Sequence, residues 1–213
     1  MAPGRLPRAS LPHDPAPAAE ATRLHELLER LGAALRAEAR AAGADLGLQP
    51  VHAEVLGYLG RCNRYSDGPL ALAEYLGLTK GTVSQSIALL ERRGLVARGD
   101  DPTDGRKVHL RLTPAGRRAL ARLVPASGLE AGAAALGPAA LAALSTALEG
   151  LLRALQRARG GRSFGVCGTC RHFLREPDGG RRCGLTREPL TERDATLLCR
   201  EHEAPGRPAA GGS

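Results

Sequence analysis

The stretch of residues 69–113 constrains the fold of this chain most strongly. A short apolar helix is expected to stop at Gly77, because glycine accepts the left-handed conformation that ends helices, and the hydroxyl of Thr79 can cap the helix that follows. That second helix carries apolar residues at helical spacing on one side, namely Val83, Ile87 and Leu90. The pattern predicts a helix, a tight turn and a second helix.

Two apolar-containing runs follow this helix pair and predict a β-hairpin. Gly94 ends the second helix, and the runs at residues 95–98 and 108–112 are separated by residues 100–105, which are rich in turn-forming types. Within the second run, apolar and polar residues alternate as in a half-exposed strand. Together these elements predict a winged helix-turn-helix.

Long amphipathic helices are expected on both sides of this unit. Leucine and alanine residues step by three and four along residues 24–42, and leucines do the same along residues 141–155. Aromatic residues make up only 2% of the chain, so the core is expected to consist of Leu, Ala and Val. We expect a mainly α-helical fold with a small β-hairpin wing, in which the long terminal helices form a dimerisation region. Packing of these helices within one chain is the alternative.

The second helix of the pair presents polar side chains that suit the major groove of DNA. With its apolar side turned to the core, a cation, hydroxyls and an amide point outward. The candidate DNA-binding residues on this helix are Lys80, Thr82, Ser84, Gln85 and Ser86. Gln85 is expected to contact a base, and the alternative is a merely soluble helix face.

Basic residues flank the tip of the predicted hairpin. Arg98, Arg106 and Lys107 are expected to reach phosphate or a minor groove, and the carboxylates of Asp101 and Asp104 can orient them. The formal charge of +8 also suits a polyanionic partner, although an arginine-rich composition alone would give the same charge.

A family resemblance rests on the run TKGTVSQSIALLERRGLVAR at residues 79–98 and the run DPTDGRKVHLRLTPAG at residues 101–116. These residues resemble the MarR-type winged-helix regulators, over about residues 22–157. The resemblance implies a homodimer that reads a pseudo-palindromic operator with its recognition helices and inserts a wing arginine into adjacent minor grooves. By the same resemblance, Ser84 and Gln85 lie on the recognition helix, and Asp104 and Arg106 match the wing Asp and Arg of the family.

The resemblance also implies an effector. Many members of that family bind small aromatic acids or use a reactive cysteine, but no residue pattern in this chain identifies a ligand pocket. Cys62 is the one thiol within the resembling region, and we interpret it as a small buried hydrophobe rather than a redox centre.

Four of the five cysteines gather near the C-terminus, at Cys167, Cys170, Cys183 and Cys199. A C-x2-C pair on a tight turn can direct two thiolates at one metal centre, and two more distant thiolates can complete four ligands. The turns are permitted by Gly168, Gly179 and Gly180, and the reserve ligands are His172 and His202. The clustering favours a metal centre over four unrelated buried cysteines.

Both Zn²⁺ and a 4Fe-4S cluster accept four thiolates. Zinc ribbons usually close with a second C-x2-C pair, which is missing here. The layout CGTCRHF at residues 167–173, RCGL at residues 182–185, Pro189-Leu190 and a final Cys199 resembles the cluster-binding stretch of high-potential iron-sulfur proteins. That resemblance implies a 4Fe-4S cluster, with Zn²⁺ as the alternative. The aromatic residues that usually shield such a cluster are mostly missing, and Phe164 and Phe173 flank the first pair.

The organisation of the chain follows from these segments. We expect a disordered tail at residues 1–19, a winged-helix and dimerisation domain at 20–160, the four-cysteine segment at 161–202 and a second disordered tail at 203–213. The first residues lack the apolar run of a signal peptide, and the apolar stretch 131–144 is interrupted and shorter than the ~20 residues of a membrane span. The expected location is the cytoplasm, with no membrane partner.

The expected function is sequence-specific regulation of transcription, with repression as the expected mode and with DNA binding that responds to the cysteine centre. One alternative is a structural zinc site with a small-molecule inducer. Another is a redox or electron-transfer protein that uses the helix-turn-helix for docking. The sequence has no Ser-His-Asp arrangement, phosphate-binding glycine loop or paired acids with a defined site, so an enzyme is not expected.

Overall fold

The computed structural model describes residues 15–101, 104–105, 107–123, 128–158, 160 and 162–205. The chain divides into two compact units, residues 1–38 and 39–213, and the long helix α1 (Pro15–Ala44) runs from the first into the second. This helix was predicted, but residues 15–19 of the expected N-terminal tail already belong to it. The rest of that tail, residues 1–14, lies outside the described residues.

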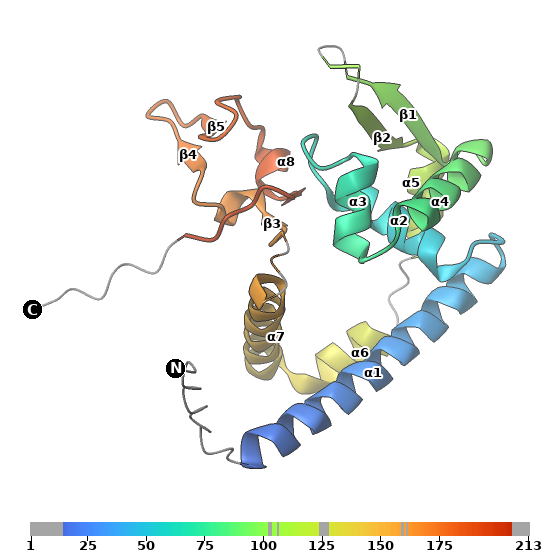
Figure 1. The fold of residues 1–213 in the computed structure, drawn as a ribbon, viewed down its shortest axis with the longest axis vertical. Helices are drawn as coiled ribbons and strands as arrows, with labels where there is room; N and C mark the ends of the chain where they lie inside the picture. Colours follow the sequence, from blue (N-terminus) through green and yellow to red (C-terminus); the bar gives the residue numbers. More distant parts are fainter. Residues whose placement is uncertain are drawn as a thin grey trace, which may run out of the picture. The chain divides into compact units, whose positions relative to one another are not determined.

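Helices α2 (Pro50–Arg61), α3 (Pro69–Leu76) and α4 (Lys80–Arg92) form the helical part of the second unit (Figure 1). Proline opens α2 and α3, where its missing N–H leaves no hydrogen bond unmade. Gly77 ends α3 with a φ of 65°, and the hydroxyl of Thr79 accepts the N–H of Thr82 at 3.2 Å. The predicted helix, turn and helix are therefore confirmed.

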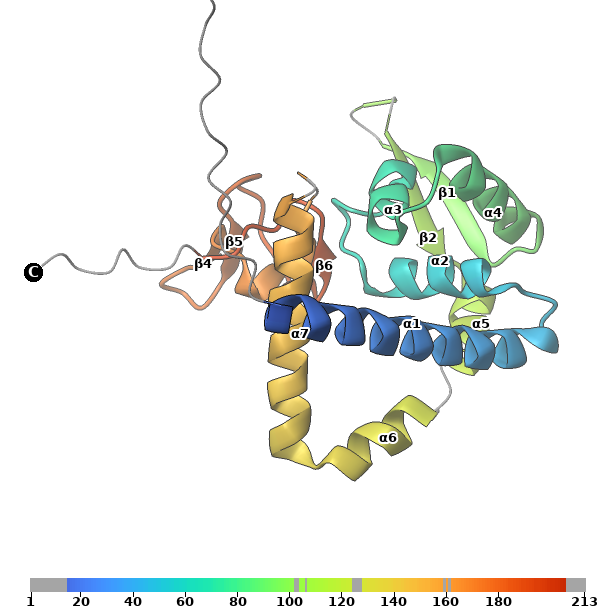
Figure 2. The same ribbon diagram turned by 60° about the horizontal axis from the view of Figure 1, so that its bottom comes forward.

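The hairpin follows α4 as predicted. Strands β1 (Val96–Asp100) and β2 (Val108–Leu112) pair antiparallel, with Val96 opposite Leu112 (Figure 2). The first strand begins one residue later than expected and extends to Asp100 because it pairs there with Val108. Residues 102, 103 and 106 at the tip lie outside the described residues.

The core lies between α2, α3, α4, the hairpin and α5 (Pro114–Leu123). Val83, Ile87 and Leu90 of α4 are buried, as the helical periodicity predicts. Most of the buried side chains are Leu, Val and Ala, but the largest is Tyr58, which the expected aliphatic core did not include.

Helices α6 (Gly128–Leu136) and α7 (Pro138–Ala158) follow. Gly137 has a φ of 74° and ends α6, and Pro138 opens α7, so the predicted break between the two helices is confirmed. Most of the α7 leucines are exposed, among them Leu144 at 46% and Leu152 at 55%. By length and composition alone α7 could cross a membrane, which is weak evidence for a span. The apolar stretch 131–144 singled out from the sequence crosses the break between α6 and α7, whereas the long apolar helix itself runs from Pro138 to Ala158.

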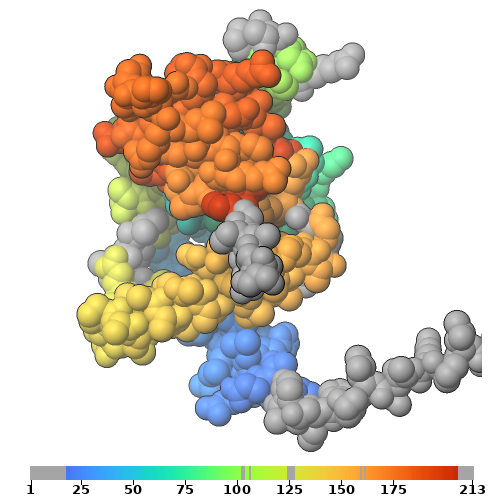
Figure 3. Space-filling view, turned by 90° about the vertical axis from the view of Figure 1, so that its left-hand side faces the viewer, coloured from blue at the N-terminus to red at the C-terminus, as the bar shows by residue number. Residues whose placement is uncertain are grey.

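The cysteine-rich segment is built from short elements. They are β3 (Gly165–Val166), the 3-10 turn η1 (Cys167–Thr169), β4 (Phe173–Arg175), β5 (Arg181–Cys183), α8 (Glu192–Ala195) and β6 (Leu198–Cys199). Strand β3 pairs with β6, and β4 pairs with β5. The space-filling view shows this segment, in orange and red, as one compact body (Figure 3).

Candidate nucleic-acid interface and cysteine pocket

Helix α4 presents most of the predicted DNA-binding side chains to solvent. Lys80, Ser84 and Gln85 are exposed. Thr82 is half-buried, and its hydroxyl lies 2.9 Å from the Thr79 hydroxyl at the helix N-terminus. A cation, a hydroxyl and an amide are thus available on one capped helix, which is the chemistry that base edges and phosphates require.

Ser86 was predicted to face the groove, and that prediction is wrong. Its side chain is buried, with 4% exposure. Ser86 lies three residues after Val83 and four before Leu90, so the helical repeat places it on the core side. A small hydroxyl side chain fits there.

The two described basic residues of the wing, Arg98 and Lys107, make different contacts. Arg98 on β1 turns back toward α4, and its Nε donates to Oε1 of Glu91 at 3.1 Å. Lys107 is exposed, and its Nζ lies 3.8 Å from a carboxylate oxygen of Asp104. Arg106 lies outside the described residues. The roles of Arg98, Asp104, Arg106 and Lys107 in DNA binding stay predictions.

A histidine bridge holds the wing, and sequence reasoning missed it. His109 on β2 lies between two carboxylates, with Nδ1 2.7 Å from Oδ1 of Asp67 and Nε2 3.0 Å from Oδ2 of Asp101. The hydrogen bonds with Asp101 and then Asp67 raise the pKa of His109 above its usual value. Asp101 Oδ1 also accepts the N–H of Asp104 at 2.9 Å, so the turn and the strand share this carboxylate.

The four predicted cysteine ligands come together around one cavity, the cysteine pocket, which is lined by Cys167, Cys170, Cys183 and Cys199. Burial, and to a smaller extent electrostatic repulsion from the other three cysteines, raises the pKa of Cys167 to about 11. Among the described residues, no group of three or more His, Cys, Asp or Glu side chains is arranged to hold a single metal ion.

Short local structure brings the thiols together. The η1 turn closes the C-x2-C pair, with the N–H of Cys170 donating to the carbonyl of Cys167 at 3.0 Å. Pairing of β3 with β6 places Gly165 opposite Cys199, and pairing of β4 with β5 places Phe173 opposite Cys183. The turn between β4 and β5 requires Gly179, whose φ is 84°.

Of the two histidines predicted as reserve metal ligands, one lies at the cysteine pocket and the other does not. His172 lines the cysteine pocket, and its Nε2 lies 3.3 Å from Glu203. His202 does not line it. Its ring packs against Gly165, and its Nε2 is 3.0 Å from the hydroxyl of Thr169.

The winged-helix part also contributes to the cysteine pocket. Tyr65, in the loop between α2 and α3, lines the cavity together with Phe173. Burial raises the pKa of the Cys199 thiol, and the nearby Asn63 side chain, the Glu201 backbone and the Ser66 side chain oppose this rise in part. No sequence signal could have found Asn63, Tyr65 and Ser66, because they lie more than a hundred positions before the cysteines.

Phe164, which precedes the first cysteine pair in the sequence, packs on the winged-helix core. Its ring centroid lies 5.2 Å from that of Tyr75 and 6.4 Å from that of Tyr58. This residue therefore anchors the cysteine-rich segment rather than shielding its thiols.

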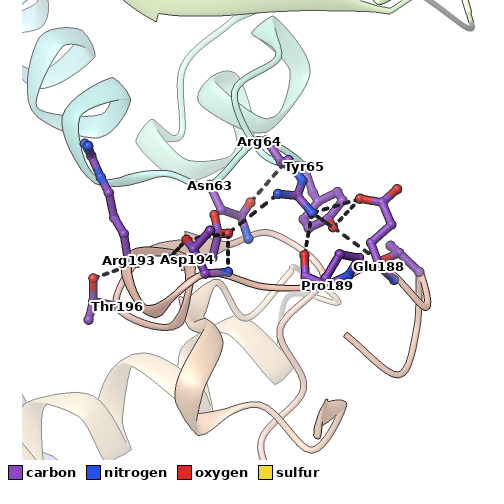
Figure 4. Close-up of polar contacts among 10 residues, drawn as sticks. Asn63, Arg64, Tyr65, Glu188, Pro189, Arg193, Asp194 and Thr196 are labelled. Carbon is purple, nitrogen blue, oxygen red and sulfur yellow. Dashed lines mark hydrogen bonds and ion pairs between the residues drawn. The ribbon is translucent and has the colours of Figure 1, made fainter. Parts of the chain in front are cut away.

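Polar contacts complete the anchoring, and Figure 4 shows those of Arg64 and Tyr65. Arg64 donates to Glu188 Oε2 at 2.9 Å, and the hydroxyl of Tyr65 donates to the same oxygen at 2.6 Å. Arg200 makes two hydrogen bonds to Glu74 of α3, at 2.6 and 2.8 Å. The cysteine-rich segment is thus fixed to the loop between α2 and α3 and to α3 itself.

Cys62, which directly follows α2, is partly buried, and its interpretation as a hydrophobic rather than a redox residue stays a prediction. It packs at the edge of the core, and burial raises its pKa to about 12. A thiol held neutral in this way is a poor nucleophile. A groove of about 560 Å³ lies beside it, and its lining includes Arg111, Arg117 and Arg193.

Comparison with known proteins agrees with this geometry. Residues 46–107 match the model of the MarR family. A segment of 56 residues is 41% identical to the transcriptional regulator HosA of Escherichia coli O111:H-, and it covers 26% of this chain and 42% of HosA. The chain therefore spans less than half the length of this curated relative.

Solved structures show the same fold. A MarR-family regulator from Silicibacter pomeroyi is 26% identical, with a TM-score of 0.52 over 59% of this chain and 85% of that chain. A mutant MarR from E. coli in complex with operator DNA is 21% identical, with a TM-score of 0.51 over 62% of this chain and 96% of that chain.

Proposed function

We infer that this chain, whose residues 46–107 match the MarR family, is a transcriptional regulator that binds operator DNA. The observation that carries the inference is the capped helix α4, which exposes Lys80, Ser84 and Gln85 beside a paired hairpin within the matching segment. The proposed location is the cytoplasm, and the proposed mode is repression.

The proposed active form is a homodimer that reads a pseudo-palindromic operator. One recognition helix fills one half-site, so a two-fold symmetric site needs two copies. The exposed leucines of α7 support this proposal, because an apolar stripe of this length is stabilised by a partner helix.

The DNA-reading role is tested with duplexes that wild-type protein selects from a random-sequence pool. Gln85→Ala should reduce the preference for the selected duplex over a random one by about 5- to 150-fold, because one base contact is worth ~1–3 kcal/mol. Lys80→Ala should weaken binding to both duplexes alike and lower the slope of log affinity against log salt by about one.

Arg118→Ala on α5 is the charge-matched control, since Arg118 is exposed and belongs neither to α4 nor to the hairpin. Fluorescence anisotropy at two salt concentrations measures all three variants. Unchanged affinity and preference in Gln85→Ala and Lys80→Ala would contradict the assignment of α4.

We propose further that Cys167, Cys170, Cys183 and Cys199 hold a 4Fe-4S cluster. The donor set fits, because four thiols line one cavity and the N–H of Glu203 donates to the sulfur of Cys170 at 3.4 Å. We propose the cluster, in which each iron takes one thiolate, over a single tetrahedral zinc ion because the segment lacks the second C-x2-C pair that usually closes a zinc ribbon. When bound, such a cluster supplies a centre whose charge changes by one electron.

The chain would then bind DNA according to the state of this centre. The contacts of Arg64, Tyr65 and Arg200 join the cysteine-rich segment to the winged helix, so a change at the thiols acts on the DNA-reading part through these contacts. A structural zinc site with a small-molecule inducer is the second candidate. The groove of about 560 Å³ supports it, because four arginines against two aspartates, Asp67 and Asp194, line the groove and favour an organic anion.

Anaerobic reconstitution distinguishes the two metals. Protein given iron and sulfide should become brown, with about four irons per chain, and Cys183→Ser should lose that absorbance while Cys62→Ser keeps it. A colourless protein that retains one zinc through the same procedure would favour the second candidate. Equal operator affinity of loaded and stripped protein would remove the sensing role.

A further inference from the structure

We propose that His109 is a positioning residue for the wing, whose protonated ring holds the hairpin in its DNA-binding conformation, so that operator affinity falls when the proton is lost. The proposal rests on the proposed DNA-binding function and does not depend on a metal at the cysteines. We call the side chains of Asp67, His109 and Asp101 the wing latch.

The wing latch joins three parts of the winged helix. His109 lies on β2, Asp67 lies in the loop between α2 and α3, and Asp101 directly follows β1. Each ring nitrogen of His109 lies within hydrogen-bond distance of a different carboxylate, at 2.7 Å for Nδ1 and 3.0 Å for Nε2. A neutral imidazole has a single N–H and can donate to one carboxylate, whereas an imidazolium donates to both. The latch is therefore complete only when the ring carries both protons.

The wing latch is largely shielded from water. The side chain of His109 is 18% exposed, and those of Asp67 and Asp101 are less exposed still. Charge-assisted hydrogen bonds are stronger in such a site than in open water. When the proton leaves, a ring lone pair faces a carboxylate at one of these short distances. An attraction is thus replaced by a repulsion on one side of the ring.

Other charged and titratable groups surround the latch. Together with His109 they line a groove of about 620 Å³, and in the described part of the chain they are Arg64, Tyr65, Lys107, Arg111 and Glu188. Arg64 and Tyr65 both donate to Glu188, Lys107 lies by Asp104, and Arg111 acts electrostatically on Asp67. The hydrogen bonds from Tyr65 and Arg64 lower the pKa of Glu188, and burial raises the pKa of Tyr65. His109 is therefore the member of this set that changes charge near neutral pH.

The latch fixes the turn that carries a candidate DNA contact. Asp101 Oδ1 accepts the N–H of Asp104 at 2.9 Å, and the N–H of Asp101 donates to the carbonyl of Lys107 at 3.2 Å. On the other side, the carbonyl of Asp67 accepts the N–H of Leu110 at 3.0 Å. A hairpin that is already held in place loses less conformational entropy when it binds DNA. Release of the latch should therefore weaken binding.

The protonation of His109 can be observed directly in the full chain. Long-range ¹H–¹⁵N spectra follow the histidine rings against pH, and the signals missing from His109→Gln identify His109. We expect both ring nitrogens to be protonated at about pH 6 and to titrate above the ordinary value of about 6.5. A His109 ring with one protonated nitrogen at about pH 6 would overturn the latch.

Fluorescence anisotropy with the selected duplex, at constant ionic strength below and above this titration, tests the effect on DNA binding. Wild-type affinity should fall by about fivefold or more, the lower range of a useful coupling. His109→Gln should bind weakly at both pH values. Asp67→Asn should bind tightly at both, because its amide can donate to the lone pair of a neutral ring. Asp178→Asn is the charge-matched control, since Asp178 is exposed in the cysteine-rich segment, and it should keep the wild-type ratio.

The outcomes separate the latch from the proposed function. Equal wild-type affinity on both sides of the titration, or the same loss in Asp67→Asn as in wild type, would overturn the latch and leave the regulator in place. A protein that binds no duplex at either pH would remove the proposed function instead.

Hydrogen–deuterium exchange of the free protein tests the latch without DNA and without a variant, so it decides the matter where a variant does not fold. After correction for the intrinsic effect of pH, the amides of residues 107–112 should exchange about fivefold faster above the titration of His109. Unchanged protection of these amides would overturn the latch.

Discussion

Gly116 in α5 lies against the backbone at the start of the hairpin. An added Cβ there would lie 2.0 Å from the carbonyl oxygen of Leu95, and a backbone atom cannot move away as a flexible side chain can. Gly116→Ala should therefore lower the free energy of unfolding by about 3 kcal/mol or more. Gly150→Ala on α7 is the control, since that position is open, and it should leave stability unchanged or raise it by up to ~1 kcal/mol. Urea denaturation measures both, and equal effects would contradict the packing at Gly116.

His109 should make stability depend on pH. Its pKa is raised in the folded chain by Asp101 and Asp67, and Arg111 also faces Asp67. A raised histidine pKa stabilises the fold fully below the unfolded value of about 6.5, and this contribution is lost as pH rises through the folded pKa. The free energy of unfolding should thus fall as pH rises from about 6.5 through the raised pKa of His109, and His109→Gln should remove this part of the slope. His25→Gln on the exposed part of α1 is the control, and an identical slope in both variants would count against the histidine bridge.

At the scale of single elements, α7 carries the most exposed apolar stripe of the second unit. Leu144, Leu148 and Leu152 lie on one face, and Thr146 lies on the opposite face of the same helix. If the stripe is the dimer interface, Leu148→Glu should shift the protein from dimer to monomer, because a buried unpaired carboxylate is strongly unfavourable. Thr146→Glu should leave the dimer intact.

Analytical ultracentrifugation without detergent measures this shift. Sedimentation of Leu148→Glu as a dimer, with the same dissociation constant as wild type, would refute the assignment. Wild-type protein that remains with membranes until detergent is added would show instead that α7 uses its length and composition to enter a bilayer.

At the scale of the whole molecule, the cysteine-rich segment and the winged helix are joined by the pair of Arg200 and Glu74. Arg200→Ala should lower the free energy of unfolding by about 1–2 kcal/mol, since the pair is partly exposed and makes two charged hydrogen bonds. In metal-free protein, Arg200→Ala should also speed the reaction of the four cysteine-pocket thiols with a disulfide reagent. Arg153→Ala removes an exposed pair within α7 and should change neither quantity. Equal thiol reactivity in both variants would contradict a role of this pair in docking.

The sequence by itself determined the elements and most of the exposed polar face of α4. Helix ends at Pro50, Gly77 and Thr79 depend on local backbone preferences, and the buried side of α4 depends on its helical repeat, so neighbouring residues suffice. The same repeat, applied strictly, would have placed Ser86 on the core side. The spacing of the cysteines likewise predicted that the four thiols meet, because two short turns and two strand pairs bring them together.

Only the tertiary structure decided which other residues surround those thiols and hold the wing. Tyr65 lines the cysteine pocket, and Asn63 and Ser66 hydrogen-bond to the backbone of Leu198 and Arg200 on either side of Cys199. Phe164 likewise reaches Tyr58 and Tyr75 across about ninety or more positions of the chain. The bridge from Asp67 through His109 to Asp101 joins a loop to a strand in the same way. Contacts of this kind follow from how the folded elements pack, and no local propensity or periodicity encodes them.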